Sequence, residues 1–241
     1  MRGFCISSLV PSDPITEEDA TALDQSLKRL EALWILQNTD PQNPNARMWE
    51  LRANVDIVWS PVVGAVDGDP KLSVVQLVAT LPPGTPDGVI AYHTLDDAGR
   101  PLCLISFAAA GSDWPSAMAH ELHEARQDGP LTQTARAPDG SLWDLETDDS
   151  LEGSDYTEPG TTIMVSNAAG PHYFGLQSSG PLDIREAMGL RSAVAVPFQQ
   201  LPTGYHVANG VEQFGDRVTA AQRAHVLSDC GRPGQRRKAR A

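Results

Sequence analysis

A strand–turn–strand–helix block between residues 89 and 127 constrains the fold of this chain more than any other part of the sequence. Two short apolar runs, 89–95 and 102–107, are joined by the turn-forming segment Asp96-Asp97-Ala98-Gly99-Arg100. This arrangement predicts a β-hairpin. A helix is predicted directly afterwards, from about residue 115 to 127, with Pro115 in its first turn. A sheet and a helix therefore follow each other closely in this part of the chain.

The remaining elements are segregated along the chain more than they alternate. A helix is predicted over about 17–37, where Thr16-x-x-Asp19 resembles a capping box and apolar residues recur at helical spacing. Strands are predicted within 55–66, over 72–81 and over 161–166, and Asn209-Gly210 indicates a second hairpin within 204–214. From Val218 onward we expect a short helix. Segregated helices and strands favour the α+β class, and 39 glycines and prolines favour a loop-rich fold.

Composition and charge limit the classes of partner and location. The formal net charge of −13 makes nucleic-acid binding by the main domain unexpected, because the phosphate backbone would repel it. No apolar stretch approaches the length of a membrane span. Three widely spaced cysteines favour a reducing, cytoplasmic location. We expect a leader loop over 1–14, a single metal-binding domain over 15–227 and a basic, disordered tail over 228–241.

The predicted helix at 115–127 carries the sequence His120-Glu121-Leu122-His123-Glu124. Residues four apart lie on one face of a helix, so His120 and Glu124 can bind one ion. In HExxH metalloproteases, the position of Glu121 holds the general base that activates a metal-bound water. Here a carboxylate replaces the second imidazole, which zinc accepts. A His120/His123 pair, three residues apart, is the alternative.

A catalytic zinc site needs a third protein ligand, and the acidic segment that follows the helix supplies candidates. Glu146 and Asp149 lie in Trp143-Asp144-Leu145-Glu146-Thr147-Asp148-Asp149, and His172 follows further on. The residues do not decide between Glu146 and Asp149. We expect Zn²⁺ as the cofactor. If several carboxylates bind together, calcium or another divalent ion becomes the alternative.

The order of five motifs resembles a family of largely uncharacterised proteins of bacteria and tailed phages with a zincin-like HExxE motif. The motifs are Ala91-Tyr92-His93, Asp97-x-Gly99-Arg100-Pro101-Leu102, Ala119-His120-Glu121-Leu122-x-Glu124, Glu146-x-x-Asp149-x-x-Glu152 and Val165-Ser166-Asn167-x-x-x-Pro171-x-Tyr173-Phe174. The resemblance covers about residues 85–180, and weaker motif matches occur at Gly204-Tyr205 and Phe214-Gly215. Ala91, Thr94 and Ser150 stand where the family pattern has Gly, Asp and Pro.

The resemblance implies a zincin-like metallopeptidase fold. We expect a mixed or antiparallel sheet packed on the long N-terminal helix and the active-site helix, with an irregular C-terminal part. It also implies that the metal ligands are among His120, Glu124, Glu146 and Asp149. Glu121 is a further shared site position, and His93 is a shared histidine on the preceding strand. In a hydrolase, Glu121 would be the general base, and His93, or alternatively Tyr156 or Tyr173, would donate a hydrogen bond to the developing oxyanion.

Two functions follow as expectations. The first is a zinc-dependent hydrolase, most simply a peptidase, acting on a peptide or protein substrate. The second is a non-catalytic structural protein, associated with a phage virion or another protein assembly, that keeps a structural metal site. A catalytic site would leave one coordination position for water, whereas protein ligands would close a structural one.

Overall fold

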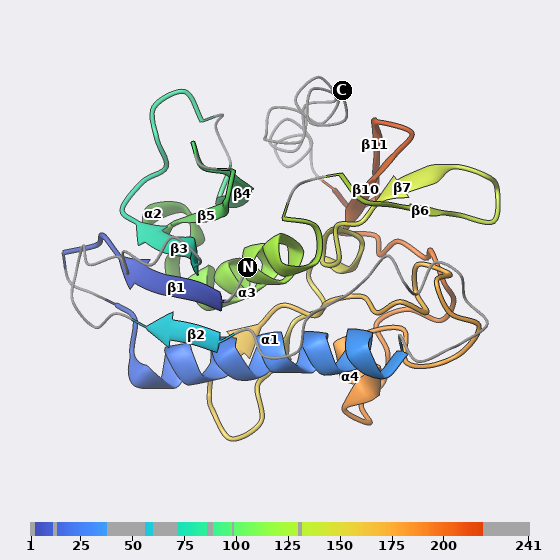
Figure 1. Ribbon diagram of the computed structural model, residues 1–241, viewed down its shortest axis with the longest axis horizontal. Helices are drawn as coiled ribbons and strands as arrows, with labels where there is room; N and C mark the ends of the chain where they lie inside the picture. Colours follow the sequence, from blue (N-terminus) through green and yellow to red (C-terminus); the bar gives the residue numbers. More distant parts are fainter. Residues whose placement is uncertain are drawn as a thin grey trace.

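The computed structural model describes residues 3–11, 14–37, 56–59, 72–85, 89–97, 99–129 and 132–218. The predicted basic tail at 228–241 and the helix expected beyond Val218 lie outside these residues. Within them the chain forms a mixed α+β fold with several sheets and few helices (Figure 1).

The largest sheet has five strands in the order β2-β1-β3-β5-β4. The strands are β1 (Gly3–Ser8), β2 (Asp56–Trp59), β3 (Leu72–Val78), β4 (Ala91–Leu95) and β5 (Pro101–Ser106). Neighbouring strands are parallel from β2 to β5. β4 lies antiparallel to β5 at one edge of the sheet, which confirms the hairpin predicted over 89–107.

The N-terminal segment departs from the leader loop expected over 1–14. Residues 3–8 form β1, which lies between β2 and β3. Phe4, Cys5 and Ile6 are fully buried. A strand of a parallel sheet that is buried on both faces reads as a short continuous apolar run, without the alternation that marks a half-exposed strand. Such a short run carries little periodic signal, and the sequence interpretation was wrong here.

The helix predicted over 17–37 corresponds to α1 (Glu17–Gln37). Its capping box is present: the Thr16 backbone N–H donates to Asp19 Oδ2 at 2.8 Å, and the Asp19 N–H donates to Thr16 Oγ1 at 3.2 Å. The helix buries Leu23, Leu27 and other apolar side chains in the core. It contacts the second long helix, α3, which also packs on β4 and β5 (Figure 1).

α3 (Trp114–Asp128) follows β5 after two short turns, α2 (Phe107–Ala110) and η2 (Gly111–Asp113). Pro115 lies in its first turn, as predicted. Asp113 occupies the N-cap position without a side-chain capping hydrogen bond. α3, which carries the HExxE sequence, therefore lies beside the edge strand β4 of the hairpin.

The remainder of the chain is irregular and carries two small sheets. One has the order β11-β10-β7-β6, and the other pairs β8 with β9. The strands are β6 (Thr134–Arg136), β7 (Leu142–Asp144), β8 (Tyr156–Thr157), β9 (Met164–Val165), β10 (Tyr205–Ala208) and β11 (Val211–Phe214). Two single-turn helices, η3 (Asp149–Leu151) and α4 (Ile184–Ala187), lie between them.

Two strand predictions in this part have different outcomes. The hairpin predicted at Asn209-Gly210 is confirmed: β10 and β11 are antiparallel, and both turn residues have positive φ, as a two-residue hairpin turn requires. The strand predicted over 161–166 is only two residues long, β9. The other residues of the predicted range lie in turns and loops.

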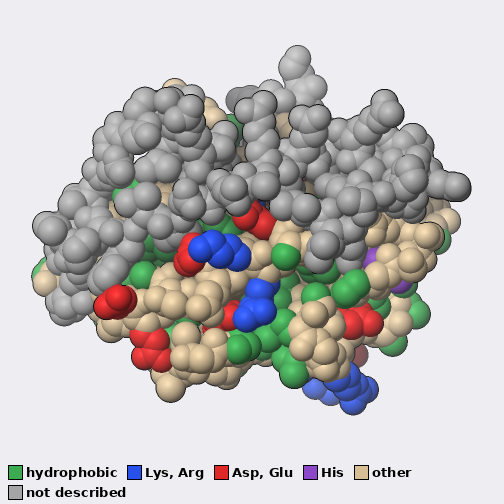
Figure 2. All heavy atoms as spheres, turned by 60° about the horizontal axis from the view of Figure 1, so that its bottom comes forward, with side chains coloured by type: hydrophobic (Ala, Val, Ile, Leu, Met, Phe, Trp, Pro, Cys, Tyr) green, Lys and Arg blue, Asp and Glu red, His purple; other side chains and the backbone are tan. Residues whose placement is uncertain are grey.

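Acidic and basic side chains are interspersed on the face shown in Figure 2, and the basic ones form no continuous patch on the described part of that face. None of the described helices combines the length and the apolar character that crossing a membrane requires. The expectation that the main domain does not bind nucleic acid stays a prediction.

Candidate metal centre

Three parts of the fold bring titratable side chains to one place. His93 lies on the edge strand β4, whose alternating burial turns its side chain inward. His120, Glu121 and Glu124 lie on α3. Glu146 follows β7, and Asp149 begins η3. The predicted site residues therefore come from a strand, a helix and the acidic segment between two short elements.

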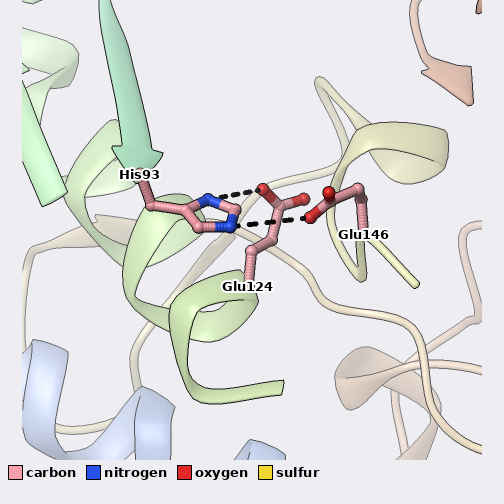
Figure 3. A group of neighbouring side chains, drawn as sticks. All are labelled: His93, Glu124 and Glu146. Atoms are coloured by element: carbon pink, nitrogen blue, oxygen red, sulfur yellow. Dashed lines mark ion pairs between the residues drawn. The ribbon is translucent and has the colours of Figure 1, made fainter. Parts of the chain in front are cut away.

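The first group of candidate ligands is His93, Glu124 and Glu146, whose ligand atoms lie within 4.8 Å of one another (Figure 3). His93 Nδ1 lies 3.6 Å from Glu124 Oε2, and His93 Nε2 lies 3.9 Å from Glu146 Oε2. All three side chains are buried, with His93 5 % exposed. His93 Nε2 is buried and has no hydrogen-bond partner. A bound cation would satisfy this nitrogen.

The second group is His120, Glu124 and Asp149, again with ligand atoms within 4.8 Å of one another. His120 Nε2 lies 3.3 Å from Glu124 Oε1 and 3.2 Å from Asp149 Oδ1. The His120 side chain is 18 % exposed, whereas Glu124 and Asp149 are buried. This group therefore reaches solvent through His120, and the first group does not.

Glu146 and Asp149 were weighed in the sequence as alternatives for one third ligand. The structure assigns them to different groups, with Glu124 common to both. His93 also lies among the candidate ligands, and its expected role as an oxyanion donor stays a prediction. Sequence spacing does not reveal this, because β4, α3 and the acidic segment meet only through tertiary packing.

Glu121 is held by His93. Its Oε2 lies 3.1 Å from His93 Nδ1, and its side chain is buried. A metal-binding histidine commonly donates its second ring N–H to a carboxylate, which orients the ring. The Glu121 carboxylate therefore directs His93 Nε2 toward Glu146, which is a role that the sequence motif alone does not suggest.

The electrostatics of the centre reflect carboxylates crowded around two histidines. Burial opposes protonation of His93, but the hydrogen bond with Glu121 and the charge on Glu146 raise its pKa to about 9. Burial likewise opposes protonation of His120, yet Glu124 and Asp149 raise its pKa well above the usual value. Burial and the charge on Asp149 raise the pKa of Glu124. A bound cation would replace these protons as the balancing positive charge.

The basic side chains with ion pairs in the described residues are directed elsewhere. Lys28 pairs with Asp24, Arg29 with Glu158, Arg100 with Asp96, and Arg126 with Glu31. The histidines are therefore the positive partners that the structure places against the carboxylates of the two groups.

His123, the alternative partner of His120, belongs to a separate buried network. Its Nδ1 lies 3.1 Å from Asp148 Oδ1, and its Nε2 lies 2.8 Å from Ser26 Oγ, which in turn contacts Tyr156. Burial opposes ionisation of Asp148, but His123 lowers the pKa of this carboxyl. The order Ser–His–Asp resembles a hydrolase triad, but Ser26 and His123 are fully buried. The network instead anchors α1 and α3 to the segment that carries Glu146 and Asp149.

Sequence reasoning missed one residue near the second group and assigned no role to another. The Tyr205 hydroxyl hydrogen-bonds to Asp149; burial and the Asp149 charge raise the pKa of Tyr205. Burial and the charge on Asp149 raise the pKa of Glu152 to about 7, although the charge on His120 acts in the opposite direction. In the sequence, Tyr205 was indicated only by the weak motif match at Gly204-Tyr205. Glu152 was indicated only as the last residue of the Glu146-x-x-Asp149-x-x-Glu152 motif. His172, in contrast, contacts the backbone oxygen of Gly180.

Comparisons with models of protein families, with curated proteins and with solved structures found no match. The functional interpretation therefore rests on the geometry of the two groups and on the resemblance drawn from the motifs.

Proposed function

We propose that this protein is a metal-dependent hydrolase, most simply a zinc-dependent peptidase of zincin-like fold. The observation that carries the proposal is the convergence of His93, His120 and Glu124 with the acidic segment in a largely buried cluster. Buried carboxylates are costly unless basic side chains, protons or metal ions balance them. The HExxE helix directly after a hairpin adds support for the zincin-like fold.

The donor set supports zinc or a similar transition ion more than calcium. Each group offers one imidazole nitrogen and two carboxylates, and imidazole with carboxylate suits zinc, whereas calcium prefers six to eight oxygen ligands. A bound ion would supply Lewis acidity to a substrate carbonyl and to a water molecule.

The protein's own residues would then have distinct tasks. His120, Glu124 and Asp149 would hold the ion on the partly exposed side, where a peptide could approach. Glu121 would accept the proton of the attacking water, which is the task of this position in the motif; its Oε2 lies 3.1 Å from His93 Nδ1. Tyr205 would help to orient Asp149, because its hydroxyl donates to that carboxylate.

The alternative is a structural metal site in a non-catalytic protein. The burial of His93, Glu124 and Glu146 specifically favours it, because a substrate does not reach a closed site. In that case the ion would anchor β4 and the acidic segment to α3. Association with a virion or another assembly belongs to this alternative and stays a prediction.

The decisive experiment measures metal content by inductively coupled plasma mass spectrometry and hydrolysis of a peptide library on the same samples. We expect zinc in the native protein and its loss in Glu124→Ala. Glu121→Gln should keep zinc and reduce hydrolysis by roughly 100-fold or more, the usual contribution of a general base. His172→Ala is the matched control and should leave both properties unchanged.

Each outcome separates the two functions. Bound zinc without hydrolysis of any peptide, in a correctly folded protein, would favour the structural alternative. No zinc after dialysis against excess zinc would refute the metal site altogether.

A further inference from the structure

We propose that this centre holds a pair of divalent cations, one in each group, with the Glu124 carboxylate bridging them. The inference rests on the proposed function for the presence of metal. It goes further in assigning two ions and different tasks to them.

The two oxygens of Glu124 face different histidines. Oε2 lies 3.6 Å from His93 Nδ1, and Oε1 lies 3.3 Å from His120 Nε2. One carboxylate therefore provides an oxygen to each group at once. A bridge of this kind suits two ions separated by about 3.5–4 Å, the usual spacing of two-metal sites.

A single ion does not account for both groups. Donor atoms bound to one ion at about 2.0–2.2 Å lie at most about 4.4 Å apart. Within the described part of the chain, the sets of ligand atoms that lie within 4.8 Å of one another contain either His93 or His120, never both. Coordination of both His93 and His120 by one ion would require the side chains to rearrange.

His93 provides an independent sign of a ligand on the buried side. Its Nε2 has no hydrogen-bond partner, and the side chain is only 5 % exposed. Its other nitrogen, Nδ1, is held by Glu121 at 3.1 Å. A ring held by a carboxylate through one nitrogen, with the other nitrogen buried 3.9 Å from Glu146 Oε2, has the arrangement of a metal-binding histidine.

The charge of the ligand groups is also compatible with two ions. Four carboxylates, from Glu121, Glu124, Glu146 and Asp149, lie beside the two histidines. With neutral histidines, two divalent cations would balance these four carboxylates.

The two ligand groups differ in their exposure to solvent, and we therefore assign a structural task to one ion and a catalytic task to the other. The His93 group is closed by buried side chains, so its ion would hold Glu124 and Glu146 in place. The His120 group opens to solvent through a side chain that is 18 % exposed. Substrate and water would therefore meet the ion held by His120 and Asp149.

The test is zinc stoichiometry of the full-length protein after equilibrium dialysis, with variants of nearly unchanged shape. The native chain should bind about two zinc ions, as in other two-metal sites. Glu146→Gln and Asp149→Asn should each retain about one, because each removes a ligand of a different group. Glu124→Gln should weaken both sites by at least about 10-fold, as it removes the shared ligand. Asp139→Asn, an exposed carboxylate in the turn between β6 and β7, is the control and should keep the native stoichiometry.

Manganese provides a second measurement that needs no variant. Two Mn²⁺ ions bridged by Glu124 should give the electron paramagnetic resonance spectrum of a coupled pair at saturation, and not that of isolated ions. This measurement decides the question if a variant fails to fold, as judged by circular dichroism.

The outcomes that would overturn the pair are distinct from those that overturn the proposed function. Binding of one ion by the native chain, lost equally in Glu146→Gln and Asp149→Asn, would show a single shared site and leave a metal-dependent hydrolase standing. A spectrum of isolated Mn²⁺ at saturation would also refute the pair. No bound metal in the native chain would refute both proposals.

Discussion

At the scale of single residues, Glu124 is the residue that contacts both histidines of the candidate metal centre. It is one turn from His120 on α3, as the HExxE spacing requires, yet it also faces His93 across the edge of the sheet. The helix spacing made the first contact predictable. The second depends on how β4 packs on α3, which is a tertiary contact.

His206 allows a prediction about acid stability. It stacks on Trp143, with ring centroids 3.4 Å apart, and burial lowers its pKa to about 4 despite the nearby Asp149 and Asp139. The ordinary histidine pKa of about 6.5 applies to the unfolded chain. Between these values the unfolded state binds the proton and the folded state does not, so His206 reduces stability as the pH falls from about 6.5 to 4.

We therefore expect His206→Phe, which keeps an aromatic ring against Trp143, to show a smaller loss of unfolding free energy between about pH 7 and pH 5 than the native protein. Urea denaturation at the two pH values measures this difference. An identical loss in both proteins would mean that His206 does not couple folding to protons.

At the scale of elements, the residue that precedes the β10–β11 hairpin, Gly204, lies in close backbone contact with the segment of the candidate metal centre. A Cβ atom at Gly204 would lie 2.6 Å from the backbone oxygens of Asp149 and Ser150. Gly204 is therefore needed for space, and its neighbour Tyr205 contacts the Asp149 side chain. Gly210 in the hairpin turn is different: it has φ +76° with open space around it, so it is needed for conformation alone.

These two glycines give a matched pair of variants. Gly204→Ala should displace the segment at Asp149 and weaken zinc binding by roughly 10-fold or more, comparable to the loss of a supporting contact. Gly210→Ala should cost about 1 kcal/mol of stability, from the positive φ, and leave zinc affinity unchanged. Zinc titration and thermal unfolding of both variants test this. Equal zinc affinities would show that the hairpin does not position Asp149.

At the scale of the whole molecule, metal binding should couple to global stability, because the candidate ligands join β4, α3 and the acidic segment. An ion present at about 100 times its Kd stabilises the folded state by about 2.7 kcal/mol. For a chain of this length, chelation should lower Tm by roughly 5–10 °C. Differential scanning calorimetry with and without EDTA measures this shift. The Glu124→Gln variant should show a smaller fall in Tm with EDTA than the native protein, and an equal fall would place the effect at another site.

The sequence by itself determined the features that arise from contacts near in the chain. These include the capped helix α1, the β4–β5 hairpin followed by α3, the Asn209-Gly210 turn, and the pairing of His120 with Glu124. Each depends on spacing within one helix or one turn, where the geometry follows from local backbone conformation. The acidic segment could also be recognised in the sequence as a source of further candidate ligands.

Only the tertiary structure decided which distant residues meet. It placed β1 inside the sheet, moved His93 among the candidate ligands, assigned Glu146 and Asp149 to opposite sides of Glu124, and brought Tyr205 to the centre. The physical reason is that strand order and the packing of a sheet edge on a helix depend on burial summed over many residues. No short stretch of sequence determines that sum. The helix with the HExxE motif could therefore be predicted from the sequence, whereas the arrangement of the candidate ligands around it could not.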